Sequence, residues 1–377
     1  MDILHKCGIE IDYVDEMPIP VPFRIAAKMD NQARFNPFRY VVELSKIVAA
    51  EGCLIFEDTR VTDFEFSTDD CCTATTKRGK VNAKYSIMAT HTPLGFNVLQ
   101  SLAAPYRSYV VAATLKSPAP NGNFWDVESP HHVTSSHPSK AGSTQLNLLM
   151  VAGSHHKVGQ PDAEDGDTTK DHYKELEKYL HKYYDVESIA YRWSAQHYKA
   201  ADSIPYIGKS PFHSERDFVA TGFFADGLVY GTVAGMLLPD LILDKDNPWA
   251  EVYDSTRFTP ISSAKEFIKE NINEALQYME YLGGTSEISD IKKGEGKIVS
   301  IDGRKCGVYR DKHNELHAVS AICTHMACIL EFNNAEKSWD CPCHGSRYDI
   351  HGKQIEGPAM SELETKPCAS LLNKGLT

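Results

Sequence analysis

The sequence predicts two folded parts in a chain of 377 residues: an α+β part over residues 1–259 and an all-β part over residues 285–377. Helical and strand-like patterns alternate through the first part. A helical pattern over residues 264–282 ends at Gly283 and Gly284, and only short strand-like runs follow it. Because a glycine pair stops a helix, we place the boundary there, with residues 260–284 as a linker helix.

Composition and charge exclude several classes of protein. The net charge is -12, the pI is about 5.7 and no basic cluster occurs, so we expect no nucleic-acid partner. No secretory signal opens the sequence. The most apolar stretch, residues 218–243, contains Asp226, Pro239 and Asp240, so we expect no membrane span. Cysteines scattered without a framework favour a cytoplasmic protein.

The first clear helix is predicted over residues 37–51, where Asn36 can cap it and Pro37 fits its first position. Spacing places four apolar side chains on one of its faces, namely Tyr40, Leu44, Ile47 and Val48. A β-rich region follows, with strand-like runs over residues 84–89, 108–115 and 146–152.

Further elements lead up to the boundary. Residues 161–168 are polar and acidic, which predicts a surface loop, and residues 169–184 form an amphipathic helical pattern. Residues 217–222 read as a strand, and residues 228–243 as a buried helix. Ser263 and Glu266 then form a capping box for the predicted helix over residues 264–282.

Cysteine and histidine are crowded into two short strings near the C-terminal end. Cys323-Thr324-His325 is followed, after fifteen residues, by Cys341-Pro342-Cys343-His344. Each string places a thiolate and an imidazole on one short loop, and two such loops can hold a binuclear iron–sulfur cluster with two cysteines on one iron and two histidines on the other. A Cys2His2 set can also hold zinc, but zinc fingers space their ligands as C-x-x-C and H-x-x-x-H.

The residues around these strings resemble Rieske proteins. The similarity extends upstream through residues 294–296 and 308–311, and downstream to residues 357–359. The resemblance implies a [2Fe–2S] cluster whose ligands are Cys323, His325, Cys341 and His344. Two neutral imidazoles in place of two thiolates raise the reduction potential to roughly -150 to +300 mV, against about -400 mV for plant-type ferredoxins.

The same resemblance implies roles for residues beside the ligands. Cys328 and Cys343 would form a disulfide that ties the loops together; two free buried thiols are the alternative. Ser346 and Tyr348 would donate hydrogen bonds to a bridging sulfide and a ligand thiolate, which places the potential in the upper part of the Rieske range. The alternative is that the ring of Tyr348 only packs. We interpret Trp339-Asp340 as a packed indole and a turn aspartate.

The first part resembles the back half of flavoproteins of the D-amino-acid-oxidase-like family, especially members with a C-terminal Rieske domain. The similar pieces occur in family order over residues 32–37, 87–93, 191–196, 202–208, 220–223 and 253–258. The resemblance implies an FAD-dependent oxidoreductase. It also implies that residues 1–259 are the substrate- and flavin-contacting half of such a domain.

Flavin contacts are expected at two places. A strand ending at Gly222 leads into a helix near Leu228, and Gly227 lets the backbone approach a flat ring, so that helix N-terminal amides point at the flavin's pyrimidine edge. A glycine-rich helix packed on a sheet is the alternative. Thr90 and His91, at a strand's carboxyl end, could line the cofactor cleft, or form a plain turn.

The family's dinucleotide-binding loop, G-x-G-x-x-G, does not occur, so we expect the chain to lack the family's dinucleotide-binding half. Three functions then follow. The first is an oxidoreductase that takes electrons from a small amine or amino-acid-like donor and delivers them to an acceptor protein or a quinone-like acceptor. The second is an electron-transfer module without FAD, and the third is one half of a split enzyme. We name no catalytic acid or base. For Arg192, a structural ion pair is favoured over binding of a substrate carboxylate.

Overall fold

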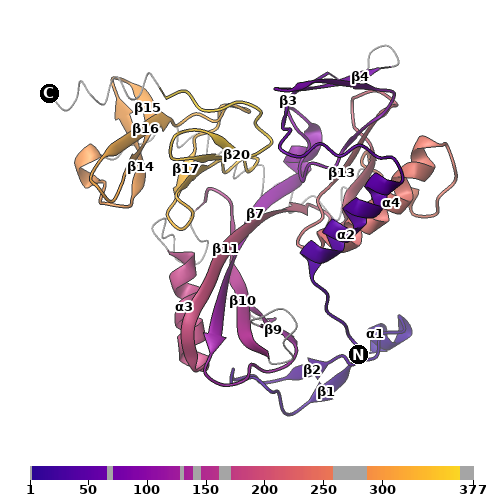
Figure 1. The fold of residues 1–377 in the computed structure, drawn as a ribbon, viewed down its shortest axis with the longest axis vertical. Helices are drawn as coiled ribbons and strands as arrows, with labels where there is room; N and C mark the ends of the chain where they lie inside the picture. Colours follow the sequence, from indigo (N-terminus) through magenta and orange to yellow (C-terminus); the bar gives the residue numbers. More distant parts are fainter. Residues whose placement is uncertain are drawn as a thin grey trace. The chain divides into compact units, whose positions relative to one another are not determined.

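The computed structural model describes residues 2–65, 71–127, 131–138, 146–160, 171–257 and 287–365. The chain divides into two compact units (Figure 1). The first comprises residues 1–58, 109–154 and 172–193, and the second comprises residues 59–108, 155–171 and 194–377. The predicted loop over residues 161–168 and the predicted helix over residues 264–282 lie outside the described residues.

The first unit begins with a short helix and an antiparallel hairpin, then a longer helix, and later adds one more helix. These elements are α1 (Asp2–Lys6), β1 (Asp12–Val14), β2 (Ala26–Lys28), α2 (Pro37–Ala50) and α3 (His172–Tyr183). On α3, the pattern predicted over residues 169–184 is confirmed, with His172, Leu176 and Leu180 buried. The ring of Tyr109 stacks on that of His172, which holds α3 to a strand.

The start of α2 follows the predicted cap. Asn36 accepts a hydrogen bond from the Arg39 amide at 3.0 Å, and Pro37 takes the first position. The helix buries none of its residues, and Leu44 and Ile47 on its predicted apolar face are 44% and 61% exposed. Periodicity therefore identified the residues that share a face, although that face is not covered within the described chain.

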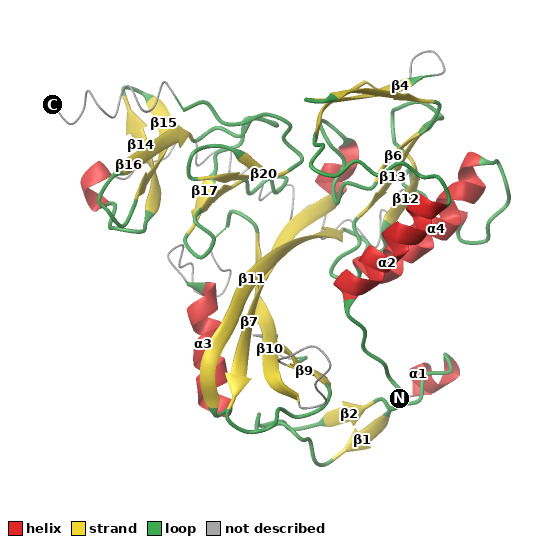
Figure 2. Ribbon diagram, in the orientation of Figure 1, coloured by secondary structure: helices red, strands yellow, loops and turns green. Residues whose placement is uncertain are grey.

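A five-stranded sheet has the order β11-β7-β10-β9-β8 (Figure 2). Its strands are β7 (Ala103–Leu115), β8 (Asn123–Trp125), β9 (Val133–Pro138), β10 (Leu146–Lys157) and β11 (Val186–Ala200). The runs predicted over residues 108–115 and 146–152 are confirmed and extend further. Buried and half-buried residues alternate along most of β7, which is the pattern of a strand with one face on a core.

The second unit contains a three-stranded sheet of order β12-β13-β6, beside helix α4. Its elements are β6 (Ser86–Met88), β12 (Tyr206–Lys209), β13 (Asp217–Thr221) and α4 (Gly227–Ile242), followed by α5 (Ala250–Tyr253). Strand β13 runs parallel to β6, with Phe218 opposite Ile87. Parallel pairing brings the carboxyl ends of both strands to one edge of the sheet.

The helix predicted over residues 228–243 is present as α4, but the prediction that it is buried holds for only one of its sides. Only Ala234, Leu237 and Leu238 of α4 are buried, whereas Val229 is 62% exposed and Met236 is 54% exposed. The buried face packs against Ile207, Phe218 and Ala220 of the sheet. A nearly continuous apolar sequence hides which side of a helix is covered, because it carries almost no periodic signal.

The C-terminal residues form two small antiparallel sheets of orders β14-β15-β16 and β17-β18-β19-β20. One buried cluster belongs to the first sheet, and a second cluster contains residues of both sheets. The strands are β14 (Gly296–Ile301), β15 (Arg304–Arg310), β16 (Leu316–Ser320), β17 (Glu331–Asn333), β18 (Ser338–Asp340), β19 (Arg347–Asp349) and β20 (Gln354–Glu356). The second unit also contains two short 3-10 helices, η1 (Val98–Leu102) and η2 (Ile288–Asp290). A further sheet in this unit has the order β3-β4-β5, with β3 (Val61–Glu65), β4 (Cys72–Thr76) and β5 (Gly79–Ala83). The prediction of an all-β C-terminal part is confirmed.

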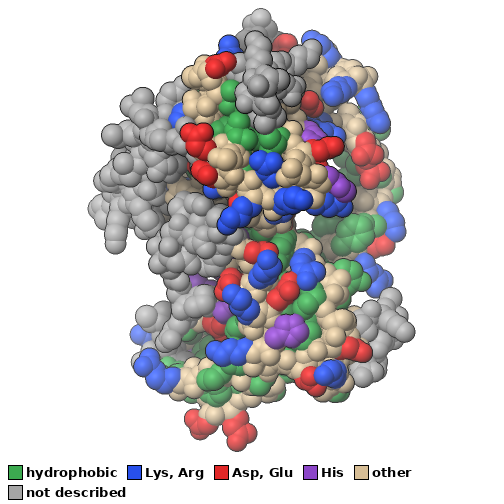
Figure 3. Space-filling model, turned by 90° about the vertical axis from the view of Figure 1, so that its left-hand side faces the viewer, with side chains coloured by type: hydrophobic (Ala, Val, Ile, Leu, Met, Phe, Trp, Pro, Cys, Tyr) green, Lys and Arg blue, Asp and Glu red, His purple; other side chains and the backbone are tan. Residues whose placement is uncertain are grey.

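Charged side chains of both signs are mixed on part of the surface. On the face shown in Figure 3, Lys and Arg side chains are interspersed with Asp and Glu side chains. Among the described helices, none combines the length and the apolarity that crossing a bilayer requires.

Candidate metal centre

Two loops of the C-terminal part are closed by the same pair of backbone hydrogen bonds. In the first loop, the Cys323 amide donates to the Cys328 carbonyl at 2.9 Å, and the Ala327 amide donates to the Cys323 carbonyl at 3.1 Å. In the second, the Cys341 amide donates to the Ser346 carbonyl at 2.8 Å, and the Gly345 amide donates to the Cys341 carbonyl at 3.0 Å. Each loop therefore holds its first cysteine by both backbone groups.

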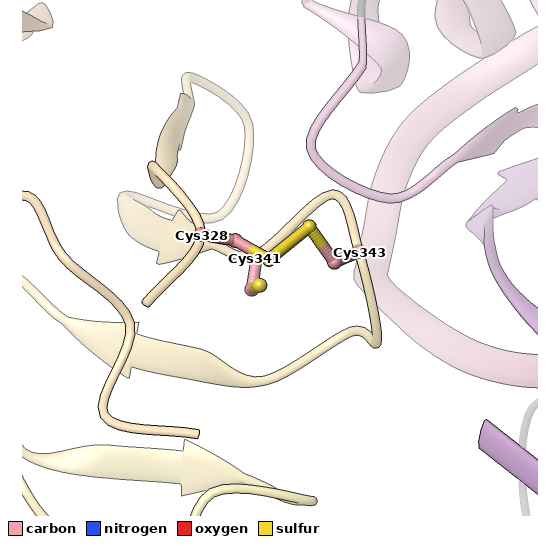
Figure 4. Close-up of side chains that lie close together, drawn as sticks. All are labelled: Cys328, Cys341 and Cys343. Atoms are coloured by element: carbon pink, nitrogen blue, oxygen red, sulfur yellow. A yellow bond between two sulfur atoms is a disulfide. The ribbon is translucent and has the colours of Figure 1, made fainter. Parts of the chain in front are cut away.

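The loops bring the four expected ligands together. Cys323, Cys341 and His344 are each at most 4% exposed, and the ring centroids of His325 and His344 lie 5.0 Å apart. A disulfide joins Cys328 of the first loop to Cys343 of the second. Figure 4 shows the Cys341 sulfur beside that disulfide. The disulfide fixes the separation of the two loops, as the Rieske resemblance implied.

The two cysteine ligands influence each other's protonation, and burial acts on the two histidines. A hydrogen bond between the two thiols lowers the pKa of Cys323 and raises that of Cys341, so Cys323 is the cysteine that the protein alone favours as a thiolate, the form that binds a metal. Burial lowers the pKa of His325, and burial with the nearby His325 lowers the pKa of His344 to about 4. Both rings are therefore neutral imidazoles.

His325 shows which of its nitrogens would face a metal. Its Nε2 lies 2.9 Å from the Gly95 carbonyl oxygen, which can only accept, so Nε2 carries the proton. Nδ1 is buried and makes no hydrogen bond to any described residue. A buried lone pair without a donor is costly unless something binds it, so this residue fits the cluster implied by the sequence.

Tyr348 and Ser346, the two expected hydrogen-bond donors, both lie beside Cys323. The Tyr348 hydroxyl is 3.5 Å from the Cys323 sulfur and 3.0 Å from the Thr324 hydroxyl. The Ser346 hydroxyl accepts a hydrogen bond from the Ala359 amide at 3.0 Å, and its hydrogen bond to Cys323 lowers the pKa of that thiol. Burial raises the pKa of Tyr348, so its hydroxyl keeps the proton that it donates.

We expect Tyr348→Phe to lower the midpoint potential of the cluster by about 60 mV. A donor to the thiolate stabilises the reduced, more negative cluster, and a hydrogen bond to a charged group worth about 1.4 kcal/mol corresponds to about 59 mV for one electron. Potentiometric titration followed by EPR measures the shift. Tyr309→Phe is the matched control, because Tyr309 is buried in the same cluster and stacks on Phe332. A potential that does not move in Tyr348→Phe would mean that the ring only packs.

A buried ion network lies beside the second loop. Arg347 Nε is 3.0 Å from Asp340 Oδ1, and Arg347 Nη1 is 2.8 Å from Glu356 Oε2. The guanidinium of Arg107, on β7, lies 2.7 Å from the same Glu356 oxygen and is 1% exposed. Asp340 is therefore not a turn aspartate, whereas Trp339 is buried as expected. The sequence carried no signal for the part of Arg107 in this network, because Arg107 lies 249 positions from Glu356 in the chain.

Two of the segments expected to contact the flavin are joined by a hydrogen bond. The Thr221 hydroxyl, at the end of β13, donates to the His91 carbonyl at 2.7 Å, which joins the segments that follow β13 and β6. The Thr90 hydroxyl donates to the Thr92 carbonyl at 2.7 Å, as in a local turn. Gly222 has a φ of +77°, a conformation that favours glycine. Residues expected to meet the flavin thus share the carboxyl edge of two parallel strands.

The N-terminus of α4 is open. The helix begins at Gly227, and Asp226 makes no side-chain cap among the described residues. A Cβ added to Gly227 would meet no atom within 4 Å, and Leu228 is 38% exposed. Uncapped amides at the positive end of a helix are suited to an anionic or electron-rich group, so this end fits a flavin edge. Arg192, in contrast, forms an ion pair with Glu177.

Comparison with known proteins identifies both parts. Residues 10–241 match the family model described as FAD dependent oxidoreductase. The chain belongs to this family of FAD-dependent oxidoreductases. Residues 285–367 match the Rieske [2Fe–2S] domain, so this oxidoreductase carries a C-terminal Rieske domain, and its cofactors are a [2Fe–2S] cluster and, in the family, FAD.

Relatives of this oxidoreductase have both parts or one of them. The chain is 33% identical to the "Putative Rieske 2Fe-2S iron-sulfur protein YhfW" of Bacillus subtilis, over 95% of this chain and 69% of that protein. Its Rieske part is 51% identical over 67 residues to the cytochrome b6-f complex iron-sulfur subunit of Nostoc punctiforme, which covers 18% of this chain and 34% of that protein. The fold resembles glycine oxidase from Geobacillus kaustophilus, with a TM-score of 0.53 and 16% identity over 68% of this chain and 70% of that one.

Proposed function

We propose that Cys323 and Cys341 bind one iron of the [2Fe–2S] cluster and that His325 and His344 bind the other. Support comes from the two loops closed by matching hydrogen bonds and from the buried Nδ1 of His325. The thiols of Cys323 and Cys341 are close enough to shift each other's pKa, and the ring centroids of the two histidines lie 5.0 Å apart. Ser346 and Tyr348 then act as hydrogen-bond donors to the cluster.

The chain is an oxidoreductase that takes electrons from a small amine or amino-acid-like donor and delivers them to an external acceptor, a protein or a quinone-like molecule. The observation that carries this proposal is the segment from Thr90 to Gly95. Its first residues, Thr90 and His91, follow β6 and are expected flavin contacts, and its last residue accepts a hydrogen bond from His325 at 2.9 Å. In this proposal, one short segment would join the flavin site to a cluster ligand.

Each part of the chain has a separate role in this proposal. When bound, a flavin supplies two-electron oxidation of the donor, and the cluster supplies one-electron transfer. Together they would convert one two-electron oxidation into two one-electron transfers to the acceptor. Thr90, His91, Gly222, Gly227 and Leu228 would hold the flavin, with the α4 N-terminus directed at its pyrimidine edge. No side chain is assigned as a catalytic acid or base.

The exposed apolar face of α2 favours a second candidate, in which this chain is one half of a split enzyme. Leu44 and Ile47 on that face are well exposed, and exposed apolar surface of this kind marks sites of association. In that case the chain alone would carry the cluster without FAD.

Counting cofactors distinguishes the two candidates. We expect the purified chain to contain iron and acid-labile sulfide in equal amounts, near two of each per chain, because that is the composition of the cluster. Flavin released by acid at one per chain supports the complete oxidoreductase, and cluster without flavin supports the split enzyme. Zinc without labile sulfide would contradict the ligand assignment.

A further inference from the structure

We propose that the oxidoreductase part of this chain covers one side of its own Rieske part, the side that carries His325 and His344 and is here called the histidine side. Four residues, here called the cap residues, make the contacts: Gly95, Arg107, Gln196 and Tyr198. In this arrangement an external redox protein cannot dock over His325 and His344 without displacing the cap. The external acceptor therefore takes electrons from another surface. The direction of the electrons rests on the proposed function, whereas the cap itself does not.

Gly95 is bound to the Rieske part through both of its backbone groups. Its carbonyl accepts from His325 Nε2 at 2.9 Å, and its amide donates to the Pro358 carbonyl at 3.2 Å. Both partners lie at the cluster end of the Rieske part, because Pro358 precedes Ala359, whose amide binds Ser346. The Nε2–H of His325, which an exposed ligand would offer to a partner, is thereby already used.

Two side chains of β11 hold the backbone beside the other histidine. The Tyr198 hydroxyl donates to the His344 carbonyl at 3.2 Å, and Gln196 Nε2 donates to the Gly345 carbonyl at 2.9 Å. Gln196 Nε2 also donates to the Tyr198 hydroxyl at 2.9 Å. Tyr198 is 2% exposed and Gln196 is 6% exposed. A buried polar contact of this kind is costly to leave unmade.

Arg107 joins the cap to the ion network of the Rieske part. The Nη2 atom of Arg107 donates to Gln196 Oε1 at 3.1 Å and to Glu356 Oε2 at 2.7 Å. Glu356 in turn binds Arg347. A continuous chain of hydrogen bonds therefore runs from Glu356 through Arg107 and Gln196 to Tyr198.

The packing at the cap leaves no room for a side chain. A Cβ built on Gly345 would lie 2.6 Å from Gln196 Nε2, 2.7 Å from Pro105 Cβ and 3.0 Å from the Tyr198 hydroxyl. A Cβ on Gly159 would lie 2.6 Å from the Pro342 nitrogen. Two glycines thus mark places where the oxidoreductase part and the second ligand loop are in van der Waals contact.

The first test measures how closely a solvent probe approaches the cluster. A water-soluble dysprosium complex is added to the reduced protein, and its effect on the relaxation of the cluster's EPR signal is recorded in the parent chain, in Tyr198→Phe, in Gln196→Ala and in the double variant. We expect a weak effect in the parent and an effect several-fold stronger in the double variant. Tyr206→Phe is the matched control, because Tyr206 is another tyrosine at 2% exposure and its ring packs under Arg257.

The outcomes separate clearly. A parent cluster relaxed as strongly as that of the double variant would show an open histidine side and overturn the cap. An equally weak effect in the parent and in the double variant would show that Gln196 and Tyr198 do not keep the cap closed. Because the signal comes from the cluster alone, neither result depends on bound flavin, so failure of the cap and failure of the proposed function are distinguishable.

A second measurement does not need the cluster. Hydrogen–deuterium exchange of the Gly95 amide reports its hydrogen bond to the Pro358 carbonyl. We expect faster exchange in the Tyr198→Phe/Gln196→Ala variant than in the parent or in Tyr206→Phe. Exchange in the parent at the rate of an unstructured peptide would overturn the contact directly.

Discussion

Cys341→Ser is expected to abolish the cluster, with loss of nearly all iron, labile sulfide and visible absorption. Cys341 is 1% exposed, and its amide and carbonyl close the second ligand loop. A serine oxygen in its place keeps the size but not the thiolate, which is the ligand that iron–sulfur clusters require. Metal analysis and the EPR signal after reduction measure the result.

Cys72→Ser is the matched control for this loss. Cys72 is also a buried cysteine, 3% exposed, and it belongs to β4 and not to either ligand loop, with its sulfur 3.2 Å from the Ala83 carbonyl oxygen. We expect this variant to keep its full iron content. Retention of the cluster in Cys341→Ser, or its loss in both variants, would contradict the ligand assignment.

Arg347→Met is expected to destabilise the Rieske part by about 3–5 kcal/mol, the usual cost of removing one partner of a buried ion pair. The side chains of Arg347 and Asp340 are 6% and 2% exposed, and methionine fills much of the volume without supplying a charge. The carboxylate of Asp340 would then remain buried without its cation. Urea denaturation followed by the visible absorption of the cluster reports the transition of this part.

Two further variants test the cause of that loss. Asp340→Asn added to Arg347→Met removes the unpaired charge, so we expect the double variant to recover part of the stability. Lys178→Met removes a cation from the exposed pair with Glu175 and should leave the denaturation midpoint unchanged. A loss in Arg347→Met no larger than in Lys178→Met would show that the buried pair contributes no stability.

Elements with strong local signals could be predicted from the sequence. The start of α2 at Pro37 follows from its Asn36 cap, and α3 follows from spacing that is confirmed by the burial of Leu176 and Leu180. Burial was harder to predict, because it depends on what another element covers. The predicted apolar face of α2 is exposed, and α4 buries only one side.

In the candidate site, too, residues with a local sequence signal could be predicted and residues brought in by tertiary contacts could not. The ligands are near neighbours in sequence, so the spacing of Cys323, His325, Cys341 and His344 carries the chemistry. Gly95, Arg107 and Gln196 lie far from these residues in the chain, and nothing local in the sequence marks them as partners. Their roles come from tertiary contacts, such as that of Gly95 with His325 across 230 positions.

Matching backbone hydrogen bonds close the two ligand loops. The residues that hold the cluster are therefore positioned independently of the side chains that adjust its reduction potential. Each loop is fixed at its ends by backbone groups, and the left-handed positions Ala327 and Gly345 complete the turns. Backbone bonds place few demands on the side chains between them, as the 38% exposure of Met326 illustrates. Substitutions at such positions can adjust the charge and polarity around a cluster while its ligands stay in place, so reduction potential and partner choice can evolve without rebuilding the centre.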